Sequence, residues 1–198
     1  HIFMLVPLFT YINLKLFTYL NKTNSVLRSI RINSLIHALL SSLGGILYLN
    51  KNISLETQYY IIKYSRAYII YDIYMFSVKK ELFNEKYETY LHHGLFFMAT
   101  LFYNTYPNLY SNTILTEIST IPLNLQYLYK HNKDLKIKFS LLFYITFLIF
   151  RILHCNYVFY KLEYTDIKLL GTCSLFSILN MYWFYSMTRK LIKFIKEK

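Results

Sequence analysis

The sequence predicts an all-α fold, a polytopic transmembrane bundle of about seven helical spans. Hydrophobic residues make up 55% of the 198 and charged residues only 16%, so polar sequence is too scarce to cover a soluble domain of this size. The charges lie mostly in short clusters between apolar segments. The apolar runs are long and continuous and do not alternate with a period of two, which argues against strands.

Apolar runs of roughly 17–25 residues mark the expected spans. The first run contains Pro7 and Lys15 but no small-residue cleavage site, so we expect a helix and not a signal peptide. The turn around Pro107 is the least defined boundary. No repeat or linker divides the chain, so residues 1–198 should form one membrane domain. The expected spans are 2–20, 32–50, 58–78, 90–106, 109–129, 137–160 and 168–189.

Basic residues are distributed unevenly between the connections. The segments 21–31, 79–89, 130–138 and 189–198 hold three, three, four and five Lys or Arg, whereas the alternate connections hold only Lys51, Lys161 and Lys168. Because basic loops stay in the cytosol, we expect an external N-terminus and a cytosolic C-terminus. The net charge of +12 then reflects topology and attraction to anionic lipid headgroups, and no nucleic acid partner is expected.

Polar side chains inside the spans are costly in lipid and usually face the interior of a bundle. Four predicted spans bring such residues to one layer near the cytosolic end, and we expect them to meet at a cavity. A second layer toward the other face should hold a buried ion pair between Glu117 and Arg151, with two parallel hydrogen bonds. The first layer consists of His37, Asp72, His92, His93 and Asn180.

Within the first layer, the adjacent His92 and His93 are the side chains suited to proton transfer or nucleophilic attack. A neutral imidazole can take a proton from an amine or attack a thioester. Because neighbouring helical residues point about 100° apart, only one of the two should face the cavity. We expect the other to hydrogen-bond Asp72 or a backbone carbonyl.

Several sequence motifs follow one another in a fixed order along the chain. They are RINSLIHALL with His37, YIIYDIYMF with Asp72, HHGLFFMATLF with His92 and His93, TEISTIPLNLQYLY with Glu117, the intramembrane Arg151, and LNMYWFY with Asn180 and Trp183. Their order and spacing, from residue 28 to 190, resemble those of the TLC-domain family of endomembrane proteins. The resemblance implies a protein of the endoplasmic reticulum whose helices surround a cavity of lipid size.

The resemblance leaves three classes of function open. The first is lipid binding or handling that influences membrane lipid composition, and the second is an acyl-CoA-dependent N-acyltransferase acting on a sphingoid base, as in ceramide synthases. The third is a cargo or trafficking receptor. Ceramide synthases carry an aspartate-rich segment where this chain has Glu117-Ile-Ser-Thr-Ile-Pro122, which resembles a small, less characterised branch of the family.

These classes assign roles to the candidate residues. His92, His93 and Asp72 are the catalytic candidates, with Asp72 orienting a histidine. His37, Asn180, Trp183, Glu117 and Arg151 are candidates for lipid binding or for lining the cavity. Buried polar residues of a bundle can also simply tie helices together.

No cofactor is expected, apart from acyl-CoA as a substrate. Only six histidines occur, and none forms the HxxxH box of a di-metal lipid oxygenase. A single-metal site of His37, His92 and Asp72 is the weaker alternative. The sequence does not determine whether the protein dimerises.

Overall fold

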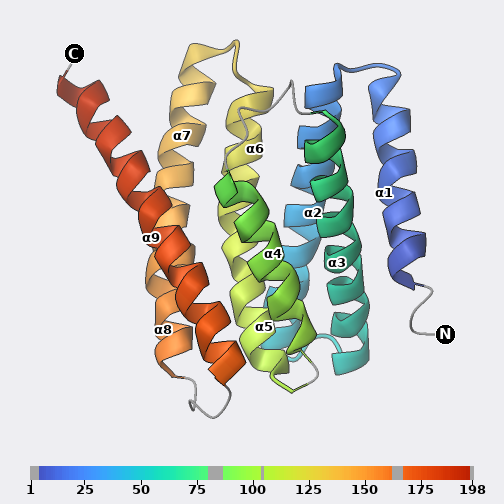
Figure 1. The fold of residues 1–198 in the computed structure, drawn as a ribbon. Helices are drawn as coiled ribbons and strands as arrows, with labels where there is room; N and C mark the ends of the chain where they lie inside the picture. The colour runs from blue at the N-terminus through green and yellow to red at the C-terminus, as the bar shows by residue number, and fades with distance from the viewer. Residues whose placement is uncertain (1–4, 80–86, 104, 162–166, 197–198) are drawn as a thin grey trace.

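A computed structural model describes residues 5–79, 87–103, 105–161 and 167–196. In these ranges seven helical stretches follow one another and no strand occurs, which confirms the all-α prediction (Figure 1). The single helices are α1 (Leu5–Asn21), α2 (Val26–Leu49), α3 (Leu55–Val78), α4 (Tyr87–Leu101) and α9 (Ile167–Lys196). The fifth stretch comprises α5 (Pro107–Thr113), η3 (Ile114–Ser119) and α6 (Thr120–Leu128). The sixth comprises α7 (Lys133–Phe147), η4 (Leu148–His154) and α8 (Cys155–Tyr160).

The observed stretches follow the expected spans, but several boundaries differ by four residues or more. Helix α7 begins at Lys133 and not at 137, and α9 continues to Lys196 and not only to 189. Helix α2 begins at Val26 and not near residue 32, because the hydroxyl of Ser25 accepts a hydrogen bond from the Arg28 amide at 3.3 Å. Helix α4 ends at Leu101 and not at 106. Pro107 starts the next helix, where its missing N–H costs nothing.

Three of the described helical stretches are long and apolar enough to cross a membrane, namely Val26–Leu49, Lys133–Tyr160 and Ile167–Lys193. Three of the other four stretches fall short for identifiable reasons. Helices α1 and α4 have 17 and 15 residues. Helix α3 is long enough but carries Lys63, Arg66 and Asp72.

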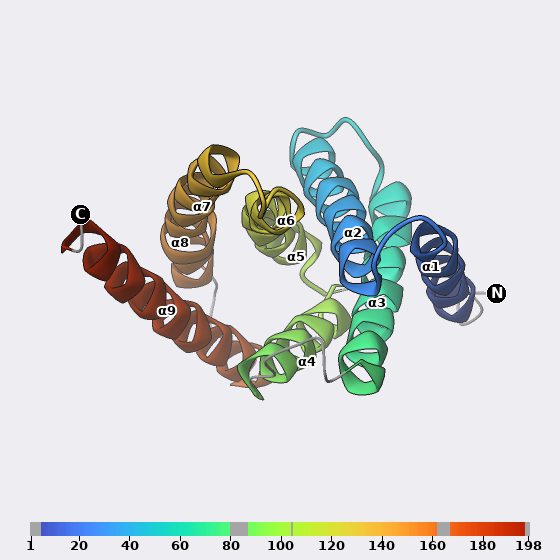
Figure 2. The same cartoon turned by 90° about the horizontal axis from the view of Figure 1, so that it is seen from above.

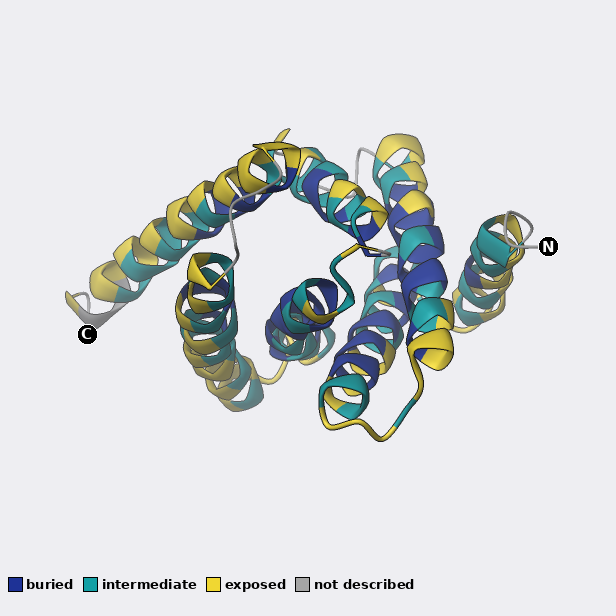
Figure 3. Ribbon diagram, turned by 90° about the horizontal axis from the view of Figure 1, so that it is seen from below, coloured by how far each residue is buried: buried dark blue, intermediate teal, exposed yellow. Residues whose placement is uncertain are grey.

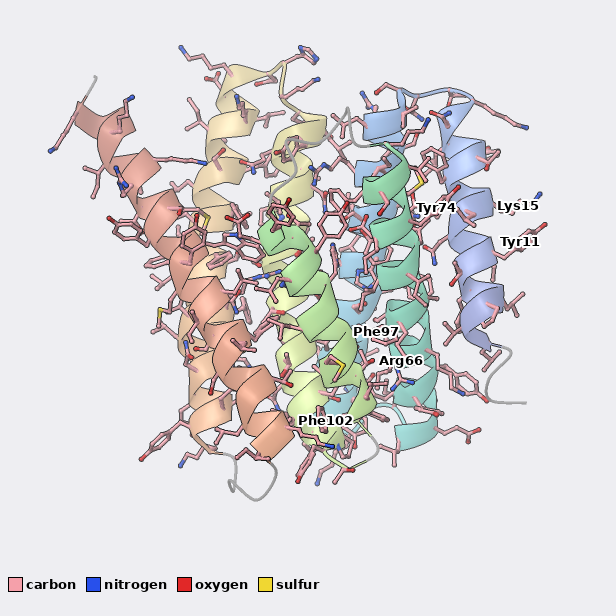
Figure 4. All side chains as sticks on the ribbon, in the orientation of Figure 1. Tyr11, Lys15, Arg66, Tyr74, Phe97 and Phe102 are labelled. Carbon is pink, nitrogen blue, oxygen red and sulfur yellow. The ribbon has the colours of Figure 1, made fainter. Side chains whose placement is uncertain are left out.

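Seen from above, α2, α3, α4, α9, α7 and α6 follow one another around a ring, and α1 packs outside it against α3 (Figure 2). Buried residues lie mainly on the faces turned toward neighbouring helices, and exposed residues cover the outer faces (Figure 3). Tyr11 and Lys15 project from α1 away from the bundle (Figure 4). The Lys15 ammonium lies 5.2 Å from the centre of the Tyr11 ring.

The two ends of the bundle differ in charge. The α1–α2 and α6–α7 connections and the end of α9 all lie at one end, the upper end in Figure 1. Three of the four basic segments therefore meet there, and α3 ends there with Lys79. Lys80, Lys86 and Lys198 of the expected basic clusters lie outside the described residues.

The lower half of the bundle, where α2, α3, α4 and α5 meet, is called the closed half below. In it Gln58 Nε2 donates to Ser111 Oγ at 3.1 Å, and Arg66 Nε donates to Thr100 Oγ1 at 2.8 Å. Helices α2 and α5 approach so closely that a Cβ on Gly45 would lie 2.9 Å from the backbone oxygen of Ser111. Figure 4 shows Arg66 on α3 beside the end of α4.

Candidate functional site

A cavity of about 630 Å³ lies between the helices of the ring. Its apolar wall includes Ile69, Phe76, Phe96, Leu123, Phe143, Phe147 and Trp183. Every one of the helices α2, α3, α4, α6, α7 and α9, together with η3 and η4, contributes to the lining. The ionisable lining residues are Arg31, His37, Asp72, His92, His93, Glu117, Arg151 and Lys190, with Tyr68, Tyr90, Tyr127 and Tyr182.

Asp72 and His93 form a close pair on the α3–α4 side of the cavity. His93 Nε2 lies 2.9 Å from Asp72 Oδ2, and the two side chains are 14% and 8% exposed. Because an ionised carboxylate only accepts hydrogen bonds, Nε2 carries the hydrogen, and in the neutral ring Nδ1 is left as an acceptor. This pair has the geometry of a general base held by an orienting carboxylate.

His92 lines the same cavity as His93, so the expectation that only one of them faces it is wrong. The His92 ring lies 5.2 Å from Trp183 and 5.5 Å from Phe176, centroid to centroid. The cavity is broad enough that two side chains about 100° apart on α4 both reach its wall.

His37 lies deep in the cavity, and its imidazole stacks on the Tyr68 ring at 3.9 Å and 8°. The residue is 2% exposed. Its Nδ1 is 4.0 Å from Glu117 Oε2, which is too long for a hydrogen bond. Within the described residues, neither ring nitrogen of His37 has a hydrogen-bond partner.

Glu117 lies between His37 and Arg151. Arg151 Nη2 approaches Glu117 Oε1 to 3.8 Å, so the two charges pair. The expected double hydrogen bond is absent from this pair, because the guanidinium instead donates to Ser119 Oγ at 2.8 Å and to Thr120 Oγ1 at 3.1 Å. We call His37, Glu117 and Arg151 the floor of the cavity.

The expected separation into two polar layers is also wrong, because the floor joins residues from both. Helix α2 starts six residues earlier than expected, which moves His37 from near one end to the middle of its helix. Glu117 likewise lies at the middle of the stretch 107–128. Both residues therefore reach the same depth.

Irregular backbone carries both charges of the floor. Glu117 lies on η3, a six-residue 3₁₀-helix, and Arg151 lies on η4, a seven-residue π-helix. Pro122 follows η3 and removes the N–H that would bond the Ile118 carbonyl, so irregularity could be expected there. No feature of the sequence around Arg151 indicates the π-helix. Long 3₁₀ and π segments are uncommon, and π segments occur frequently at functional sites.

The part of the cavity nearest the basic end is lined by Arg31 on α2, Tyr127 on α6 and Lys190 on α9. The Arg31 guanidinium lies 4.0 Å over the Tyr127 ring. The sequence analysis assigned Arg31 and Lys190 only to the basic segments that set the topology, and it assigned no role to Tyr68. Tyr68 had a usable signal, since it precedes Asp72 by one helical turn and must share its face.

Trp183 lines the cavity, but Asn180 does not, which corrects the expected role of Asn180. The two residues lie about 60° apart around α9, and the helix turns Trp183 inward. Asn180 is fully buried, and its amide atoms have no hydrogen-bond partner in the part of the chain that the structure describes. Among those residues, no group of three or more His, Cys, Asp or Glu side chains could hold a metal ion.

Comparison with known proteins places this chain in a family. A family model described as TLC domain matches residues 29–189, which is most of the chain. No curated protein and no solved structure matches it. The sequence motifs around His37, Asp72 and His92 all fall inside the matched region. The chain is a membrane protein that belongs to the TLC-domain family.

Proposed function

We propose that this protein binds a lipid in the cavity and thereby influences the lipid composition of its membrane. The observation that carries the proposal is the cavity itself, about 630 Å³ in volume and lined by both apolar and ionisable side chains. Ligand cavities of proteins typically measure roughly 300–1,000 Å³. An amphipathic lipid matches this lining, because its chain can contact Phe143, Phe147 and Leu123 while its polar group meets the histidines.

The proposal includes seven membrane crossings with the C-terminus in the cytosol, in the endoplasmic reticulum. Support comes from the gathering of the basic connections at one end of the bundle. Helix α1 starts at the opposite end from the last turn of α9, as an odd number of crossings requires. The lysines and arginines at the basic end would face anionic headgroups of the cytosolic leaflet.

Native mass spectrometry of the detergent-purified protein tests lipid binding. We expect one lipid to remain bound per chain and to be identified after release. A protein that stays folded but carries no lipid, and takes up none from a mixed membrane extract, would contradict the proposal.

A second candidate function, N-acyl transfer from acyl-CoA to a sphingoid base, is favoured by the 2.9 Å contact between His93 and Asp72. In this reaction the amine nitrogen attacks the thioester carbonyl carbon, and His93 Nδ1 takes the proton from that nitrogen. The carbon–sulfur bond then breaks, and the CoA thiolate leaves and is protonated. The products are an amide and free CoA.

Incubation of the purified protein with acyl-CoA and sphinganine tests the second candidate. Loss of a general base typically slows a reaction by about 10²–10⁴-fold, so His93→Ala should reduce amide formation by that factor. Asp72→Asn should reduce it less, because it keeps the shape and removes the charge. His131→Ala, on the exposed α6–α7 connection, is the matched control. Unchanged turnover in the His92→Ala, His93→Ala double variant would exclude this mechanism.

A further inference from the structure

If the cavity binds a lipid as proposed above, its floor can select the polar group of that lipid. His37 is 98% buried, lines the cavity and has no hydrogen-bond partner for either nitrogen among the described residues. Buried polar atoms are nearly always hydrogen-bonded, and an unmade bond costs on the order of 1–3 kcal/mol. The His37 imidazole therefore lacks a hydrogen-bond partner. Because it faces the cavity, a bound ligand can supply one.

The distance between His37 and Glu117 suits a single bridging atom. Nδ1 and Oε2 are 4.0 Å apart. One oxygen can lie about 2.8 Å from both, at an angle of about 90° between them. The oxygen of a hydroxyl group fits this position.

The charges of the floor restrict the bridging group further. Arg151, 3.8 Å from Glu117, already balances the carboxylate. An anionic group would be repelled by Oε2 of the Glu117 carboxylate, and a cationic group would add a buried charge that no free carboxylate at the floor offsets. A neutral imidazole supplies one donor and one acceptor, and the carboxylate supplies acceptors only. With the hydrogen on Nδ1 of His37, the bridging group accepts from the imidazole and donates to the carboxylate while staying uncharged.

We propose that the floor of the cavity is a subsite for an uncharged hydroxyl group of the bound lipid. The hydroxyl donates its hydrogen to Glu117 Oε2 and accepts one from His37 Nδ1. Arg151 holds the carboxylate in place through its bonds to Ser119 and Thr120. The ligand class is lipids with a free hydroxyl on a neutral polar group, such as long-chain alcohols and monoacylglycerols.

The chain contains one tryptophan, Trp183, and it lines the cavity, so its fluorescence reports occupancy. A dibrominated palmityl alcohol should quench Trp183 at a stoichiometry of one per chain in detergent. Unlabelled competitors with the same chain then displace it: palmityl alcohol, its methyl ether, palmitate and palmitylamine. We expect the alcohol to compete about tenfold better than the ether, which cannot donate. Palmitate and palmitylamine should be weaker than the alcohol by a similar or larger factor.

Two variants test whether His37 causes the preference for the alcohol over the methyl ether. His37→Phe keeps the ring stacked on Tyr68 and removes both nitrogens, so alcohol and ether should compete equally. His154→Phe is the control, since His154 Nε2 also has no partner in the described part of the chain but does not line the cavity. It should preserve the preference.

The results of these experiments distinguish failure of the hydroxyl subsite from failure of lipid binding in general. If neither the dibrominated alcohol nor a phospholipid with dibrominated chains quenches Trp183 in the folded wild-type protein, the proposed function fails. If only the phospholipid quenches it, the hydroxyl subsite is wrong and lipid binding stands. If the lipids bind but alcohol, ether, acid and amine compete equally in the wild type, the hydroxyl subsite is wrong and lipid binding stands. The wild-type series needs no mutation, so misfolding of a variant does not leave the subsite untested.

Discussion

Gln58 and Arg66 in the closed half differ from His37 at the cavity in how they satisfy their hydrogen-bonding groups. Gln58 Nε2 donates to Ser111 and Arg66 donates to Thr100, each across to a neighbouring helix, although Gln58 Oε1 has no partner among the described residues. At the cavity His37 has none among the described residues, and His92 Nδ1 has none either. Since the same helices run through both halves, the difference does not arise from the type of helix.

We propose that this difference separates polar residues that hold helices together from polar residues that meet a ligand. Interhelical hydrogen bonds tie helices together inside a membrane, and the closed half uses its polar residues in this way. The cavity half keeps an imidazole stacked and unpartnered beside a carboxylate 4.0 Å away. Irregular backbone in η3 and η4 occurs at the same place, where it presents Glu117 and Arg151 to each other.

The largest stability effect is expected at the one charge pair of the floor. Arg151→Met leaves Glu117 buried without its partner and should destabilise by about 3–5 kcal/mol. Thermal unfolding in detergent measures the loss. Adding Glu117→Gln to Arg151→Met should recover part of it, because the stranded charge is then removed. Simple additivity of the two changes would show that they are not partners.

Gly45→Ala probes the packing of the closed half without touching the cavity. The new Cβ would lie 2.7 Å from Ile114 Cγ2 and 2.9 Å from the Ser111 backbone oxygen, so α2 and α5 must move apart. We expect a loss of about 1–3 kcal/mol in the same unfolding measurement. Gly171→Ala is the control, since nothing lies within 4 Å of its Cβ. Equal stability of both variants would show that the closed half is not tightly packed.

Removing one buried polar side chain from each half allows their contributions to stability to be compared directly. Gln58→Leu strands the hydroxyl of Ser111 and should cost about 1–3 kcal/mol. His37→Phe removes no hydrogen bond and keeps the stacking on Tyr68, so its cost should stay below about 1 kcal/mol, although His37 is equally buried. Unfolding of the two variants side by side measures the contrast. A larger cost for His37→Phe would assign His37 a structural role.

Much of the fold was predictable, because long apolar runs and basic clusters follow from the cost of polar groups in lipid. The boundaries were less predictable where a local cap decided them, as Ser25 did for α2. That single error placed His37 in the wrong layer. The grouping of His37 with Glu117 required the depth of both helices, which the sequence around either residue does not specify.

At the site, the residue types were predictable and the contacts only partly so. The cost of Asp72 in a membrane led directly to a search for its partner, and His93 is that partner. The contacts of Arg151 were not foreseen, because a π-helix turns its guanidinium toward Ser119 and Thr120. Asn180 was misplaced since periodicity alone does not determine how a helix is rotated about its axis.

Lipid occupancy of a filled-cavity variant tests the central claim most directly. Leu123 lines the cavity and makes no side-chain hydrogen bond, so Leu123→Trp occupies cavity volume without stranding a polar group. Leu175→Trp, at a position 51% exposed on α9, is the matched control. Native mass spectrometry should find about one lipid per chain in the wild type and in Leu175→Trp, and nearly none in folded Leu123→Trp. Equal lipid content in all three proteins would show that the bound lipid lies outside the cavity and would contradict the account.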